Sequence, residues 1–308
     1  MQKILIAIDG SDPSLAAVRY VGRLFAKQSH IALLHVISDI PEAIRDMHAS
    51  ASALGEDPAL GLWRAHQEQM INDLMQQAHD ILVDAGFANE TITAHVQPMQ
   101  TGIARDIINE SHQSYSVLVV GRTGVSNIED IRMGSVTSKL VETIGHLPLV
   151  VVGEGSESKK IMIALDGSEG SMKAVEYAGA LLDPADGEVL FTHVIRPLKI
   201  RQLSSREIFK QKHEEQWIAT NHRKIVPVIS EAKKRLLEAG FRQEQISNEI
   251  LTYQKSRAAA IVKAAEVGGY HTIMLGRRGL TSVGEFRMGR VSRKILRFAF
   301  RPTLWIVN

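Results

Sequence analysis

The sequence of 308 residues contains no cysteine, only 5% aromatic residues and no long apolar run. The lack of cysteine excludes disulfide bonds, thiolate nucleophiles and cysteine ligands for a metal. No run of about eighteen apolar residues is present to cross a membrane, and the first residues lead into a strand pattern rather than a signal peptide. A net charge of +2 is too small to predict nucleic-acid binding by the whole chain. These absences predict a cytoplasmic protein.

What the sequence does contain is one pattern that occurs twice. The segment IAIDGSDPSLAAVRYVGRLF returns as IALDGSEGSMKAVEYAGALL, and VVGRTGVSNIEDIRMGSVTSKL returns as MLGRRGLTSVGEFRMGRVSRKI. The chain is also long for a single core, because single cores stop growing near about 250 to 300 residues. We therefore predict two domains, at residues 1–153 and 160–308, joined by a small, polar linker at 154–159.

Each half alternates apolar strand patterns with segments of helical periodicity. Continuous apolar strands such as SVLVVG and PLVVV are typical of parallel sheets that helices cover on both faces. The sequence thus predicts a doubly wound α/β fold with five strands and four helices in each copy. The stretches at 45–63 and 196–217 differ most between the copies. They are predicted to be lids or partner surfaces, or merely variable connections.

A spaced glycine pattern follows the fourth predicted strand of the first copy. It reads G-x2-G-x9-G-S and comprises Gly121, Gly124, Gly134 and Ser135. Glycines at a strand end allow a tight turn and close approach of a ligand, and the free amides of a helix start attract a phosphate. We expect the Ser135 and Thr137 hydroxyls to add hydrogen-bond donors. The alternative is ordinary turn and helix-cap chemistry.

Asp9 stands at the carboxyl end of the first strand, where open α/β sheets bind their ligands. If the first and fourth strands are neighbours, Asp9 and Gly121 line one crevice. Asp9 would then accept a hydrogen bond from a sugar hydroxyl, or meet a metal held by phosphates. The combination favours a nucleotide site in each copy.

With these residues in view, the chain resembles tandem universal stress proteins with two UspA-like domains. The resemblance rests on Asp9-Gly10-Ser11, on LLHVI at 33–37 and on VVGRTG through GSVT at 119–137, with their counterparts in the second half. In that family the glycine spacing marks the ATP-binding branch. The resemblance implies a flavodoxin-like parallel sheet of order 3-2-1-4-5 in each domain, with ATP over strands one and four. It also implies a role in the stress response and pairing of the two domains through their last strands, with a homodimer as a further expectation.

The resemblance also assigns cofactor-binding residues by position. In the first copy they are Ile8, Asp9, Val36, Val120, Gly121, Arg122, Gly124, Gly134, Ser135, Val136 and Thr137. In the second copy they are Asp166, Val194, Gly276, Gly279, Gly289, Arg290 and Ser292. Arg290 stands where the family has Ser or Thr. Its guanidinium either reaches a phosphate, fills the phosphate pocket or points to solvent.

No residue is predicted to be catalytic, and no metal is predicted to be bound by protein ligands alone. The sequence contains no G-x4-G-K-[ST], H-E-x2-H or G-x-S-x-G motif, and His35 and His193 are interpreted as strand histidines. The arginines between 277 and 301 are interpreted as a solvated face or a phosphate environment, because no aromatic residues interleave them to stack on bases.

The predicted function is nucleotide-dependent regulation or choice of an unknown protein partner. ATP is the expected ligand, with AMP or ADP as alternatives and Mg²⁺ on the phosphates. The alternative functions are a slow ATPase or phosphotransferase, and a nucleotide-free scaffold.

Overall fold

The computed structural model describes residues 2–38, 58–124, 133–155, 157–185, 187–197, 207–280 and 287–308. Residues 45–57 and 198–206 of the two variable connections lie outside these ranges, so the predicted role of these connections as lids or partner surfaces stays a prediction. Among the described residues, no helix combines the length and apolar character needed to cross a bilayer.

The second half repeats the first, element for element. The first comprises β1 (Lys3–Ala7), α1 (Asp12–Leu24), β2 (His30–Ile37), α3 (Pro58–Asp84), a 3-10 helix (Asn89–Thr91), β3 (Ile92–Pro98), α4 (Ile103–Ser111), β4 (Val117–Gly121), α5 (Ser135–Thr143) and β5 (Leu149–Val152). The second comprises β6 (Lys160–Ala164), α6 (Glu169–Leu181), β7 (Glu188–Val194), α7 (Glu207–Glu238), a 3-10 helix (Gln243–Gln245), β8 (Ile246–Leu251), α8 (Arg257–Gly268), β9 (Thr272–Gly276), α9 (Arg290–Phe298) and β10 (Thr303–Val307).

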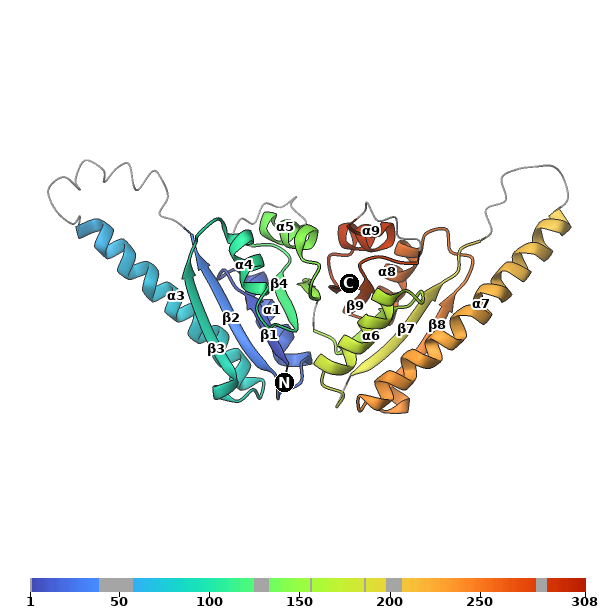
Figure 1. Cartoon of the computed structure of the whole chain (residues 1–308), viewed down its shortest axis with the longest axis horizontal. Helices are drawn as coiled ribbons and strands as arrows, with labels where there is room; N and C mark the ends of the chain where they lie inside the picture. Colours follow the sequence, from blue (N-terminus) through green and yellow to red (C-terminus); the bar gives the residue numbers. More distant parts are fainter. Residues whose placement is uncertain are drawn as a thin grey trace.

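The strands of both halves form one continuous sheet. Its order is β3-β2-β1-β4-β5-β10-β9-β6-β7-β8, so each half has the predicted order 3-2-1-4-5. All pairs within a half are parallel, whereas β5 and β10 are antiparallel at the centre. Figure 1 shows the two halves side by side, with α3 and α7 at opposite ends of the molecule. The fold class is confirmed, and the last strands do pair within one chain.

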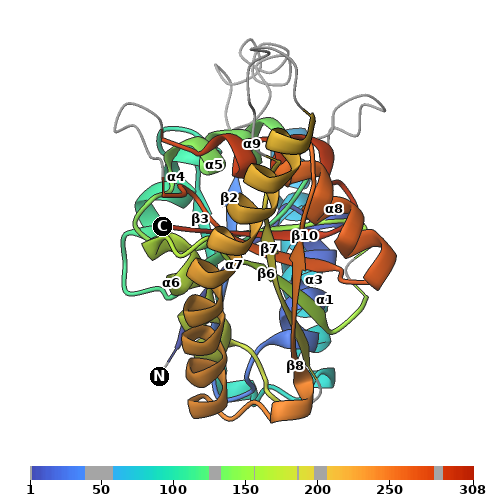
Figure 2. The same ribbon diagram turned by 90° about the vertical axis from the view of Figure 1, so that its right-hand side faces the viewer.

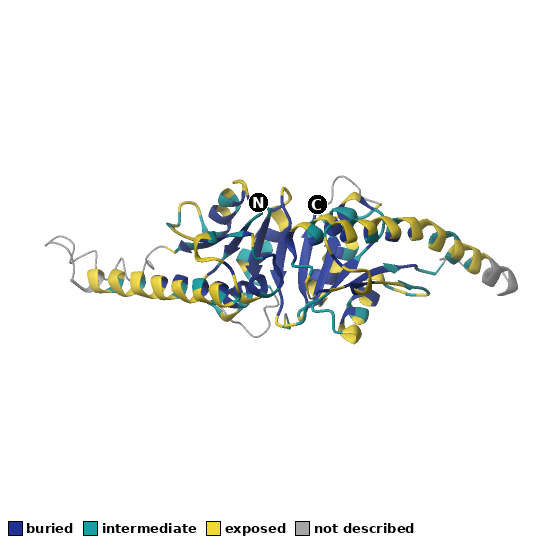
Figure 3. Ribbon diagram, turned by 90° about the horizontal axis from the view of Figure 1, so that it is seen from below, coloured by how far each residue is buried: buried dark blue, intermediate teal, exposed yellow. Residues whose placement is uncertain are grey.

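Two helices cover each face of the sheet in each half. Alternate strand residues point to opposite faces: Ile4 and Ile6 pack in one core with α1 and α3, whereas Leu5 packs in the other with α4 and α5. The second half repeats this arrangement with α6 and α7 on one face and α8 and α9 on the other. Figure 3 shows the sheet as a buried layer and the outer faces of α3 and α7 as exposed. Both core clusters contain residues of both halves, so the apolar interior continues across the central junction.

Side chains of the first half also reach into the second at this junction. Tyr20 on α1 lies next to Thr272 on β9, with 3.0 Å between their hydroxyl oxygens, and the Trp305 indole nitrogen donates to the Tyr20 hydroxyl at 2.8 Å. Phe25 stacks on Trp305, with 5.4 Å between the ring centroids. Tyr20, Phe25 and Trp305 are fully buried. Phe25 has extended backbone, which ends α1 at Leu24.

Candidate functional site

The candidate site of the first half lies where the strand order reverses, between β1 and β4. These strands are parallel neighbours, with Ala7 opposite Val120. Asp9 follows β1 and Gly121 ends β4, so both come to the carboxyl edge of the sheet. This is the position that open α/β sheets use for ligands. The predicted adjacency of the two segments is therefore present.

Asp9 is fixed by the turn that starts α1. Its Oδ1 accepts hydrogen bonds from the Ser11 amide at 3.0 Å and the Ser11 hydroxyl at 2.5 Å. Gly10 has φ +84°, a backbone conformation that side chains other than glycine rarely adopt. Asp9 is exposed, and its Oδ2 faces Gly124, where an added Cβ would stand 2.6 Å away. Glycine at position 124 thus keeps space beside the Asp9 carboxylate.

Gly121 has a structural role that the glycine pattern did not predict. A Cβ there would lie 2.7 Å from the carbonyl carbon of Pro13, in the first turn of α1. The glycine therefore allows α1 to pack closely on the end of β4. Gly276 has the same role in the second half, where a Cβ would lie 2.9 Å from the carbonyl carbon of Gly170 on α6. The close approach is one of backbone to backbone rather than of backbone to ligand.

Helix α5 starts at the same edge without a side-chain cap. Its cap residue is Gly134, and within the described residues no side chain accepts from its first turn. By contrast, Ser11 caps α1, Ser168 caps α6 and Ser256 caps α8. The open amides and the helix dipole make the start of α5 suited to an anion. Ser135, the first residue of α5, is exposed there.

The Thr137 hydroxyl does not add to this anion site. Thr137 is buried, and its hydroxyl donates to the Gly121 carbonyl oxygen at 2.9 Å. Ser292 makes the matching bond to Gly276 at 2.7 Å. The single hydroxyl proton of each side chain thus fastens a helix start to a strand end. Only the backbone of Thr137 is left for the predicted role in phosphate binding.

The Arg122 side chain likewise points away from this candidate site. It is buried between the halves, where Nη2 donates to the carbonyl oxygens of Leu296 at 2.9 Å and Ala299 at 2.6 Å, at the end of α9. Arg277 reciprocates, donating to the carbonyl oxygens of Val141 and Ile144 at the end of α5. Burial lowers the pKa of Arg122 and of Arg277 to about 10. These two arginines hold each half against the other half's helix, and Arg277 is not among the residues that line the second-half crevice described below.

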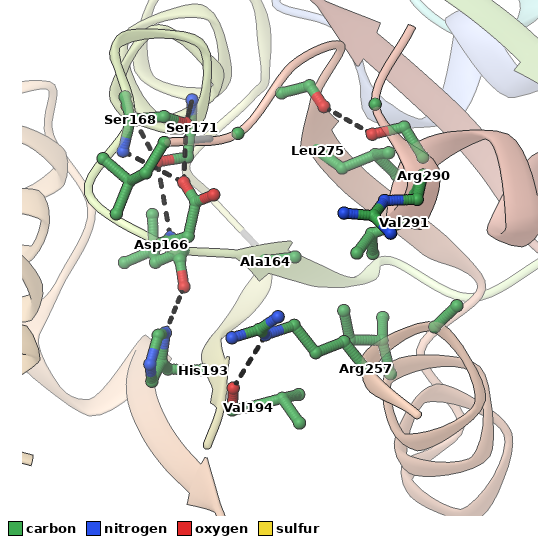
Figure 4. Close-up of a pocket in the computed structure, with 18 of the residues that line it drawn as sticks. Ala164, Asp166, Ser168, Ser171, His193, Val194, Arg257, Leu275, Arg290 and Val291 are labelled. Carbon is green, nitrogen blue, oxygen red and sulfur yellow. Dashed lines mark hydrogen bonds between the residues drawn. The ribbon is translucent and has the colours of Figure 1, made fainter. Parts of the chain in front are cut away.

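In the second half the same geometry surrounds a crevice of about 850 Å³. Asp166 follows β6, and its Oδ1 accepts from the Ser168 amide at 3.0 Å and hydroxyl at 2.5 Å. A Cβ at Gly279 would stand 2.5 Å from its Oδ2. Asp166, Val194, Gly276, Gly279, Gly289, Arg290 and Ser292 all line this crevice. In Figure 4 the guanidinium groups of Arg257 and Arg290 point toward its middle, across from Asp166.

His35 on β2 and His193 on β7 occupy equivalent positions in the two halves. The Nδ1 atoms of His35 and His193 lie 2.9 Å and 2.6 Å from the carbonyl oxygens of Ile8 and Leu165, respectively. Each thus ties the second strand of its half to the residue before the aspartate. Burial lowers the pKa of His193, and the Leu165 hydrogen bond opposes that shift only in part. Their interpretation as strand histidines agrees with these bonds.

Known proteins share this architecture and these sequence patterns. A family model described as the universal stress protein family matches residues 1–153 and 157–306. The chain belongs to the universal stress protein family. A universal stress protein of Mycolicibacterium smegmatis is 24% identical over 180 residues, covering 57% of this chain and 58% of that protein. YxiE, a universal stress protein of Bacillus subtilis, is 26% identical over 153 residues, covering 47% of this chain and 96% of that protein.

Solved structures give the same fold for the whole chain. A universal stress protein from Archaeoglobus fulgidus has a TM-score of 0.58 at 18% identity, covering 99% of this chain and 98% of its own. A protein of unknown function from Pseudomonas aeruginosa has a TM-score of 0.58 at 13% identity, covering 100% of this chain and 92% of its own. At these identities the likeness concerns the fold alone.

Proposed function

We propose that this universal stress protein binds ATP in its first crevice and that the occupancy of this crevice regulates its association with a partner. The observation that carries the proposal is the open start of α5 opposite Asp9, across the junction of β1 and β4. An uncapped helix start suits phosphate, and a carboxylate in the same crevice suits a ribose hydroxyl or a phosphate-bound Mg²⁺. Ile8, Val36 and Val120 would line the remainder of the nucleotide.

The residues present fit this ligand in their chemistry. The amides of Ser135, Val136 and Thr137 would hold the phosphates, and the bare face of Gly124 leaves room beside Asp9. Mg²⁺, when bound, would neutralise phosphate charge and would be held mainly by the nucleotide. Because Oδ1 of Asp9 already accepts two hydrogen bonds from Ser11, Oδ2 is the oxygen that would contact a ligand.

Regulation through binding is preferred to rapid turnover because the sequence contains no recognised catalytic motif. The stress response as the setting, the cytoplasm as the location and a homodimer as the assembly remain predictions from sequence and resemblance. Slow hydrolysis is checked by incubating the full chain with MgATP and measuring ADP by chromatography. We expect no release within minutes; turnover on that timescale would contradict a purely regulatory role.

The substitution Gly124→Ala tests the first crevice directly. The new Cβ would stand 2.6 Å from Oδ2 of Asp9, so the carboxylate must move into the ligand space. We expect ATP affinity at this site to fall at least about tenfold, as for the loss of one hydrogen bond to a charged group. Titration calorimetry of the full chain would measure this loss of affinity.

Gly61→Ala is the matched control, because a Cβ at this exposed position of α3 meets nothing within 4 Å. It should bind ATP as the unaltered chain does. Equal ATP binding by the Gly124→Ala variant and the unaltered chain would contradict the proposed site.

A further inference from the structure

The two crevices share one backbone plan but differ sharply in charge. Seven cationic side chains and a single carboxylate, that of Asp166, line the second crevice among the described residues. Six of the cations are arginine or lysine where the first copy has a neutral residue: Arg196, Lys255, Arg257, Arg278, Arg290 and Arg293. The equivalent first-copy residues are Ser38, Thr101, Ile103, Thr123, Ser135 and Ser138. The second copy therefore keeps the backbone arrangement of the first but carries more positive charge at these positions.

These cations come from separate elements and surround one space. Arg196 follows β7, Arg257 begins α8, Arg278 follows β9 and Arg290 begins α9. Figure 4 shows Arg257 and Arg290 entering from two helices toward the same middle region. Within the part of the chain that the structure describes, none of the seven cations has a carboxylate at salt-bridge distance. A cation group in this arrangement is suited to an anion that touches several elements at once.

The electrostatics around Arg257 support the same conclusion. Although the side chain is exposed as a whole, the pKa of Arg257 lies below its ordinary value, because the protein removes water from the guanidinium and Arg196 repels it. Asp166 opposes this shift only in part. Nε of Arg196 is buried without a hydrogen-bond partner among the described residues. A bound polyanion would relieve both the repulsion and the unpaired donor.

The size of the crevice selects a small ligand rather than a nucleic acid. Its volume of about 850 Å³ lies in the range of small-molecule sites, and α9 begins in it at Arg290, after the cap residue Gly289 and without a side-chain cap. A guanidinium group can donate two parallel hydrogen bonds to the oxygens of one phosphate. A helix start adds free amides and a favourable dipole. A monovalent anion would satisfy few of these groups. A chain of phosphates would satisfy several of them together.

We propose that the second crevice binds a small polyanion, an inorganic chain of three or more phosphates, and selects it by charge. This inference goes beyond the proposed function, which concerns the first crevice. It also assigns Arg290 a role in binding phosphate, rather than the alternative role of filling the phosphate pocket. The cations supply the selectivity, and the shared backbone supplies the site.

The test uses inorganic tripolyphosphate and the full chain, with binding followed by calorimetry and by the fluorescence of Trp217. Trp217 lines the crevice and its indole nitrogen donates to the Arg196 carbonyl oxygen at 3.0 Å, so it reports a ligand bound there. We expect one tripolyphosphate per chain, weaker binding of pyrophosphate and weaker still of orthophosphate. No tripolyphosphate binding, or equal affinity for all three anions, would overturn the proposal.

The double substitution Arg257→Ile with Arg290→Ser gives the second crevice the residues of the first. We expect tripolyphosphate affinity to fall at least about 100-fold, because two charge-assisted contacts are lost. The exposed Arg278→Thr exchange should weaken binding about tenfold by the same reasoning. Lys224→Ser with Lys234→Ser removes the same charge from exposed positions of α7 and should leave affinity nearly unchanged. An equal loss in both double variants would show nonspecific attraction and overturn the proposal.

Two further outcomes separate this inference from the proposed function. The Gly124→Ala chain should retain its tripolyphosphate, because that substitution alters only the first crevice. Loss of tripolyphosphate in that variant would contradict the assignment to the second crevice. A single-stranded DNA 20-mer should not displace tripolyphosphate at equal concentration, and displacement would overturn the choice of a small ligand.

Discussion

At the scale of single residues, each candidate site contains an aspartate whose carboxylate accepts hydrogen bonds from a nearby serine, and a glycine whose missing side chain leaves room beside that carboxylate. Asp9 with Gly124 and Asp166 with Gly279 repeat the same contacts to within 0.1 Å. The sequence predicted that Asp9 and the glycine pattern lie at one edge of the sheet, because the motif spacing and the strand ends are both local signals, but it did not pair Asp9 with Gly124. It could not predict that Gly121 contacts Pro13 or that the Arg122 side chain leaves the crevice. Those contacts depend on how a helix and the other half pack, which no local pattern records.

His193 gives a residue-scale prediction for pH dependence. Burial lowers its pKa in the folded chain, while an unfolded histidine titrates near about 6.5. Below that pH the unfolded chain binds a proton that folded His193 does not yet bind, so the free energy of unfolding falls. The His193→Asn variant should lose less stability than the unaltered chain between pH 7 and pH 5.5, measured by urea unfolding. Identical pH slopes for the two chains would contradict this.

At the scale of elements, the two halves are joined by more than the β5–β10 ladder. Helix α1 reaches β9 and β10 through Tyr20, while Arg122 and Arg277 hold the ends of α9 and α5. Figures 1 and 2 both place α5 and α9 at the same edge of the molecule. The sequence predicted the helices and strands because their periodicities are strong. It could not predict these contacts, since Tyr20 and Trp305 are separated by 285 positions.

Tyr20→Phe tests this junction. The substitution keeps the buried ring but removes the hydroxyl that accepts from the Trp305 indole nitrogen and contacts Thr272. An indole N–H left unpaired in the core should lower the free energy of unfolding by about 1 to 3 kcal/mol. Tyr177, the counterpart on α6, is only partly buried. Tyr177→Phe should therefore change the free energy of unfolding by less than about 0.5 kcal/mol. Denaturant titration distinguishes the two; equal effects would contradict the account of the junction.

At the scale of the whole molecule, a duplicated sequence has become one continuous sheet with two unlike crevices. The resemblance implied the pairing of the last strands, and the structure realises it as an antiparallel ladder between β5 and β10. At the start of the predicted linker, the Gly155 amide donates to the Arg301 carbonyl oxygen at 2.9 Å. The sequence alone predicted only part of the charge difference between the two crevices. Arg290 stood out within the motif, but Arg196 and Arg257 join it only through the fold.

Because both apolar cores cross the central junction, the chain should unfold as one unit. Trp305 of the second half is fully buried against Phe25 of the first, so neither half keeps its core if the other unfolds. Scanning calorimetry should give a single transition whose calorimetric enthalpy equals the van't Hoff enthalpy. Two resolved transitions, or a calorimetric enthalpy near twice the van't Hoff value, would show that the halves unfold independently.

Native mass spectrometry of the full chain tests most directly whether the two crevices bind different ligands. The chain would be mixed with ATP and an excess of inorganic tripolyphosphate, and the bound masses would be counted. We expect a dominant species that carries one ATP and one tripolyphosphate per chain, and the loss of tripolyphosphate alone in the Arg257→Ile, Arg290→Ser variant. A chain that carries two ATP and no tripolyphosphate under these conditions, or neither ligand, would contradict it.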